Sequence, residues 1–98
     1  MNVLLDECVP ARFAVRSSAI LLRLFRERRF TSARGKEFDA FVTEDRKLAR
    51  QQDLANLRIP VLLIRAQTNR LQHIQPLAAD LLETIHTAPA GEVTMIGG

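Results

Sequence analysis

The chain has 98 residues, of which 47% are hydrophobic and 26% charged, and its net charge is +3. These values predict one globular domain over residues 1–98 and exclude a disordered or fibrous chain. A single cysteine, Cys8, excludes an internal disulfide framework and fits a reducing compartment. No apolar run approaches the roughly 20 residues of a membrane-spanning helix, and the N-terminus lacks a signal-peptide pattern. We therefore expect a cytoplasmic protein with no membrane association.

Basic residues are concentrated in one part of the chain. Eight lysines and arginines lie between Arg12 and Lys36 against a single acid, Glu27, and none follows Arg70. A one-sided basic surface is typical of proteins that bind a polyanion such as RNA. The same residues also suit the solvated face of an ordinary helix. Charge alone leaves both interpretations open.

The first predicted elements are a strand and a long helix. Residues 2–5 form a short apolar run, which predicts a central strand covered on both faces. Pro10 suits the first turn of a helix, and apolar residues then recur at steps of seven and four up to about Arg28. This spacing predicts an amphipathic helix of about 18 residues. A loop is expected over 30–36.

Three further strands are predicted, at 39–43, at 60–65 and, at an edge of the sheet, at 92–96. Each is a short apolar run close to turn residues or proline. Because strands alternate with helical patterns, we expect an α/β fold. A short, mainly parallel central sheet would lie between helices in a three-layer α/β/α arrangement.

Two helices are predicted between these strands. Residues 46–52 have the length and the preceding capping groups of a short helix. Apolar side chains at helical spacing predict a longer helix over 71–85, with Thr68 or Asn69 as its N-cap. Pro76 lies inside this pattern and is expected to kink or restart the helix.

Acidic residues follow two of the predicted strands. Asp6 and Glu7 end the first strand, and Glu44 and Asp45 follow 39–43. The carboxyl ends of neighbouring parallel strands meet at one edge of a sheet, where carboxylates can share Mg²⁺ or Mn²⁺. The pattern predicts a metal site held by Asp6 and Asp45, with Glu7 and Glu44 beside them. The alternative is that both aspartates cap the helices after them.

Three stretches resemble the PIN-like family of small bacterial nucleases, which is related to the PilT N-terminal domain. They are VLLDECVP near the start, FDAFVTEDRKLARQQDL in the middle and PVLLIRAQTNRL after it. The resemblance implies the PIN-like fold and a metal-dependent endoribonuclease that is the toxin of a toxin–antitoxin pair. It implies Asp6 and Asp45 as metal-binding acids, with Glu7 and Arg46 beside them. RNA and a cognate antitoxin are the partners expected on this basis. A second copy of the chain, or the antitoxin, is a further alternative as the partner that covers the apolar stripe of the arginine-rich stretch.

Residues 13–36 depart from the family's pattern. They are too few for the strand and the acid-bearing helix that the family has there, which leaves open a sheet that lacks one strand. Glu27 is the only acid between Cys8 and Lys36, and its surroundings do not match those of the family's acid. The alternative function is therefore a catalytically degenerate PIN-like module that binds nucleic acid or protein. The expected nucleic-acid-binding residues are arginines of the basic stretch and of the second acidic strand end, namely Arg12, Arg16, Arg26, Arg28, Arg29 and Arg46.

Other reactive side chains are given structural roles. Cys8 adjoins the acidic pair but has no activating base next to it, so we expect a buried structural thiol. His73 and His86 lack the partner residues of a zinc site and are expected at the surface or in packing. No glycine-rich loop follows a predicted strand, which argues against a nucleotide-binding P-loop.

Overall fold

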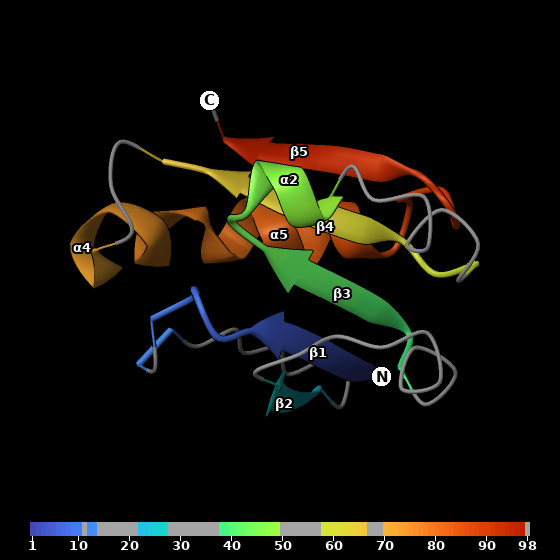
Figure 1. Cartoon of the computed structure of the whole chain (residues 1–98), viewed down its shortest axis with the longest axis horizontal. Helices are drawn as coiled ribbons and strands as arrows, with labels where there is room; N and C mark the ends of the chain where they lie inside the picture. The colour runs from blue at the N-terminus through green and yellow to red at the C-terminus, as the bar shows by residue number, and fades with distance from the viewer. Residues whose placement is uncertain (11, 14–21, 28–37, 50–57, 67–69, 98) are drawn as a thin grey trace.

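The computed structural model describes residues 1–10, 12–13, 22–27, 38–49, 58–66 and 70–97 (Figure 1). They form a small α/β protein around one parallel sheet. The strands are β1 (Asn2–Asp6), β2 (Arg23–Glu27), β3 (Ala40–Thr43), β4 (Val61–Arg65) and β5 (Val93–Gly97). The helical elements are α2 (Arg46–Ala49), α4 (Leu71–Ile74), the 3₁₀ turn η1 (Gln75–Leu77) and α5 (Ala78–Ile85).

All five strands run parallel, in the order β2-β1-β3-β4-β5. The predicted strands at 2–5, 39–43, 60–65 and 92–96 are confirmed, and the last lies at an edge as expected. β1, β3 and β4 are apolar along almost their whole length because parallel strands in the middle of a sheet are covered on both faces. This topology brings the carboxyl ends of β1, β3 and β4 to one edge.

Buried side chains form a core on each face of the sheet. The larger core joins Val3, Leu5 and Val42 of the sheet to Leu81 and Ile85 of α5, and α5 lies behind the sheet in Figure 1. The smaller core, on the other face, consists of Leu4, Phe38, Phe41, Ile59, Val61 and Leu63. α2, a single turn, contacts β3 and β4 and lies in front of the sheet in Figure 1.

The helix predicted from Pro10 to about Arg28 is wrong over its last third. Arg23–Glu27 is strand β2, which pairs with the whole length of β1. Leu24 packs against the larger core, and the ring of Phe25 meets that of Phe38 edge-on with centroids 5.3 Å apart. Pairing satisfies backbone groups of β1 that would otherwise be left at an open edge. Residues 23–27 therefore form a strand of the sheet. The alternative of a sheet that lacks one strand in this part of the chain is also wrong.

Several predictions in the basic stretch lie outside the described residues. They are the middle of the predicted helix, at 14–21, and the loop at 30–36, with the side chains of Arg16, Arg28 and Arg29. The backbone of Arg26 belongs to β2, whereas the prediction placed it on a helix. Arg12 is described and exposed.

The helical predictions of the second half are largely confirmed. The helix at 46–52 begins at Arg46 and is described as far as Ala49. Pro76 lies in η1 between α4 and α5, so the predicted interruption of 71–85 is present. The N-cap of α4 is Arg70, whose backbone is extended, and the prediction of Thr68 or Asn69 is wrong by one or two residues. No helix among the described elements is long and apolar enough to cross a membrane.

Candidate functional site

The two acidic strand ends come together, as the sequence predicts. β1 and β3 are parallel neighbours, with Leu5 level with Val42. The next residues along each strand are Asp6 and Thr43, and the Thr43 hydroxyl donates a hydrogen bond of 2.8 Å to Oδ2 of Asp6. The carboxyl edge of the sheet therefore holds both acidic segments within hydrogen-bonding reach.

Asp6 is buried, with 8% of its surface exposed, and its carboxylate accepts three hydrogen bonds. The backbone N–H of Glu7 donates to Oδ1 at 2.9 Å. The Thr43 hydroxyl and the Cys8 thiol donate to Oδ2, at 2.8 and 3.1 Å. Three donors compensate for much of the water that the carboxylate loses on burial. Asp6 is therefore fixed in position by the protein itself.

Thr43 connects the two strand ends. Its side chain is fully buried, and its hydroxyl accepts a hydrogen bond of 3.0 Å from the backbone N–H of Asp45 while it donates to Asp6. The sequence analysis considered Thr43 only as a capping group and missed its contact with Asp6. The available signal was a polar β-branched residue that ends an apolar strand directly before two acids.

Cys8 is half-buried beside the same carboxylate. Its sulfur accepts a hydrogen bond from the backbone N–H of Glu44 at 3.4 Å and lies 3.7 Å from the Thr43 hydroxyl. Burial, together with the hydrogen bond and the negative charge of Asp6, raises the pKa of the thiol to about 11. The thiol is thus protonated at neutral pH, in keeping with the structural role predicted for it.

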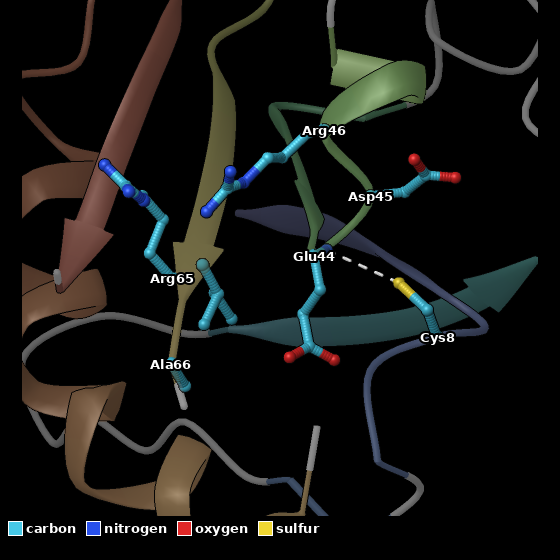
Figure 2. Close-up of a pocket in the computed structure, with 7 residues that line it drawn as sticks. Cys8, Glu44, Asp45, Arg46, Arg65 and Ala66 are labelled. Carbon is cyan, nitrogen blue, oxygen red and sulfur yellow. Dashed lines mark hydrogen bonds between the residues drawn. The ribbon is translucent and has the colours of Figure 1, made fainter. Parts of the chain in front are cut away.

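Asp45 has a different role from Asp6. Its carboxylate is exposed, and Oδ1 accepts a hydrogen bond of 2.9 Å from the backbone N–H of Lys47 in the first turn of α2. Figure 2 shows this carboxylate turned away from the neighbouring pocket. Asp45 therefore caps α2, as the alternative interpretation of the sequence predicts. The Asp6 carboxylate instead connects the ends of β1 and β3.

A pocket of about 380 Å³ opens at this edge, and Glu44 points into it (Figure 2). Oε2 of Glu44 is buried and has no hydrogen-bond partner in the part of the chain that the structure describes. Burial raises the pKa of the Glu44 carboxyl above its usual value. The acid presented to the pocket is thus Glu44. The residues that line the pocket are Cys8, Glu44, Asp45, Arg46, Ile64, Arg65 and Ala66.

Of the other predicted site residues, one lines this pocket and two lie at the surface. Arg46 is exposed and lines the pocket. Glu7 and Arg12 are exposed and are not part of the pocket wall. Arg65, the last residue of β4, also lines the pocket and was not predicted as a site residue.

The described residues contain no group of three or more histidine, cysteine, aspartate or glutamate side chains placed to hold a metal ion. Asp6 and Glu44 both contact Cys8, Asp6 through its carboxylate and Glu44 through its backbone. The carboxylate accepts a hydrogen bond from the thiol, and the backbone N–H donates one to the sulfur. The described residues thus offer a cation at this edge fewer than three such side chains in one group.

Comparisons with known proteins do not assign a family. No family model, no curated protein and no solved structure matches this chain. The resemblance to PIN-like nucleases rests on the three sequence stretches quoted above and stays a prediction.

Proposed function

We propose that this protein is a PIN-like, Mg²⁺-dependent endoribonuclease whose reactive site is the carboxyl edge of β1 and β3. The observation that carries the proposal is the buried, unpartnered Oε2 of Glu44 at the pocket. A buried oxygen without a donor is costly unless another group satisfies it. A divalent cation is a natural partner for such an oxygen.

The proposed metal ligands are Asp6 and Glu44, with Glu44 in place of the expected Asp45. Oδ1 of Asp6 accepts one hydrogen bond and keeps a second acceptor site, whereas Oδ2 already accepts two. Mg²⁺ is commonly held by one or two carboxylates, with water and substrate phosphate completing its shell. This donor set therefore fits Mg²⁺ or Mn²⁺ better than an ion that requires an all-protein cage.

The chain's own residues would orient the reacting groups. A bound divalent ion supplies positive charge that acidifies water and offsets charge on a phosphodiester. Thr43 and Cys8 fix the Asp6 carboxylate, and Arg46 at the pocket attracts the RNA backbone. A toxin role in the cytoplasm, a cognate antitoxin or second copy as partner, and a complete three-layer α/β/α fold belong to the same proposal.

Cleavage of single-stranded RNA by the purified chain, with Mg²⁺ or with EDTA, tests the proposal. Asp6→Asn and Glu44→Gln are each expected to lower the rate at least about a hundredfold, since each removes a charged ligand. Glu83→Gln, at an exposed position of α5, is the matched control and should leave the rate unchanged. Absence of Mg²⁺-dependent cleavage, or variants as active as the control, would overturn the proposal.

A second candidate is a non-enzymatic module that binds nucleic acid. It is favoured by the three protein donors on Asp6 and by the capping role of Asp45, which leave few free carboxylate oxygens among the described residues at this edge. Such a module would bind RNA in a salt-sensitive way, without cleavage and without loss of affinity in Asp6→Asn or Glu44→Gln. The same variants thus separate the two functions.

A further inference from the structure

Two arginines line the pocket that Glu44 enters. Arg46 is the first residue of α2, directly after the acidic end of β3, and Arg65 is the last residue of β4. β3 and β4 are parallel neighbours, with Thr43 level with Leu63, so both arginines are carried to the same edge. Figure 2 shows the two side chains on one side of the pocket and the Glu44 carboxylate below them.

The backbone of Arg65 is held closely by the edge strand. It is level with Gly97 of β5, whose backbone has a φ of +81°. A Cβ at Gly97 would lie 2.7 Å from the Arg65 carbonyl oxygen, so only glycine permits this approach. The side chain of Arg65 consequently starts from a fixed point at the pocket wall.

Neither positive charge is neutralised by the part of the protein that the structure describes. The contact of the Arg65 guanidinium is with the sulfur of Met95 at 3.4 Å, a weak acceptor. The Arg46 side chain has no ion pair or hydrogen bond within the described residues. The adjoining carboxylate of Asp45 is turned away and accepts from the backbone of Lys47. Two arginines at one pocket, neither with a carboxylate partner among the described residues, are suited to an anion.

We infer that Arg46 and Arg65 together bind one phosphodiester group of single-stranded RNA at this pocket. Planar guanidinium groups make paired, charge-assisted hydrogen bonds to phosphate oxygens. A volume of about 380 Å³ leaves room for a phosphate and an attached nucleoside. The inference rests on the proposed function for RNA as the ligand, but binding of the phosphate requires no cleavage.

The test measures binding of a fluorescein-labelled, ten-nucleotide single-stranded RNA to the full chain in EDTA by fluorescence anisotropy. Arg65→Ala and Arg46→Ala are each expected to weaken binding about tenfold or more, since each removes a charge-assisted contact. Arg65→Lys should restore only part of the affinity because lysine lacks the planar fork. The matched control is Arg23→Ala, which removes the same charge from an exposed position on β2 at the far edge of the sheet.

Two readouts distinguish a pocket contact from general electrostatics. Each pocket variant should reduce the slope of log affinity against log salt by roughly 0.7, the value for one phosphate contact on a single strand. Inorganic phosphate should displace RNA from the wild-type chain more effectively than from the double variant. Thermal unfolding checks that each variant is folded, and exposed Arg46 provides the test if Arg65→Ala does not fold.

The outcomes separate this inference from the proposed function. Weaker binding by both pocket variants than by Arg23→Ala supports the inference even if no cleavage is ever seen. Equal binding by Arg65→Ala, Arg46→Ala and Arg23→Ala overturns it, even if Glu44-dependent cleavage is established. Binding of inorganic phosphate without binding of RNA also overturns it, because the pocket would then be a site for free phosphate.

Discussion

The acidic ends of β1 and β3 share a sequence pattern but differ in structure. Asp6 is buried and accepts hydrogen bonds from three donors, whereas Asp45 is exposed and caps a helical turn. Between them, Glu44 places an unpartnered oxygen at the pocket. Acids that follow similar apolar runs thus have different roles.

The difference follows from how far each acid lies from its strand. Asp6 is the last residue of β1 and stands level with Thr43, so its side chain meets the neighbouring strand. Asp45 comes two residues after β3, where the chain turns into α2, and the free N–H groups of that turn attract its carboxylate. An acid directly at a strand end is held by the sheet, and one slightly later is held by the next helix.

Removal of Asp6 should have the largest effect on stability. Asp6→Ala leaves the Thr43 hydroxyl, the Cys8 thiol and the Glu7 N–H without their acceptor. At about 1 kcal/mol per unmade hydrogen bond, the free energy of unfolding should fall by about 3 kcal/mol. Urea unfolding measures the change. Asp6→Asn, which keeps one carbonyl oxygen, should lose clearly less, and an alanine variant within about 0.5 kcal/mol of wild type would contradict this role.

The reactivity of the Cys8 thiol tests its burial beside Asp6 at the end of β1. Because its pKa rises from 9.0 to about 11, native protein in EDTA should react with iodoacetamide at pH 8 about a hundredfold more slowly than unfolded protein. A raised pKa stabilises the fold below pH 9, and this contribution is lost as the pH rises toward 11. Asp6→Asn should speed labelling, since Asp6 contributes to the shift. Equal rates in native and unfolded protein would contradict the structure.

Removal of Asp45 should have the smallest of these effects. Asp45→Ala loses the cap on the Lys47 N–H, and we expect the free energy of unfolding to fall by about 1 kcal/mol in urea titrations. Asp45→Asn retains a capping oxygen and should be nearly neutral.

Asp45→Asn also sharpens the comparison of the two strand ends in the RNA cleavage assay. It should keep activity that Glu44→Gln loses, because Glu44 faces the pocket. Equal loss of cleavage activity in both variants would indicate that Asp45 is a metal ligand.

Local sequence patterns were reliable where burial acts on consecutive residues. The apolar runs at β1, β3 and β4, the edge position of β5 and the interruption at Pro76 are all present. β2 was missed because Leu24 and Phe25 fit the apolar spacing of a helix. Pairing with β1, about twenty residues away, decided in favour of a strand.

The sequence by itself determined the parallel α/β sheet and the convergence of two acidic strand ends. Short apolar runs between helical patterns admit few other topologies. Only the tertiary structure decided which acid is buried, which caps a helix and which faces the pocket. Only the tertiary structure also shows that Thr43, Cys8 and Arg65 lie at the site. Their neighbours lie on segments far apart in the chain, as in the contact between Thr43 and Asp6 across 37 residues. Hydrogen bonds of this kind depend on strand register, which a single sequence does not display.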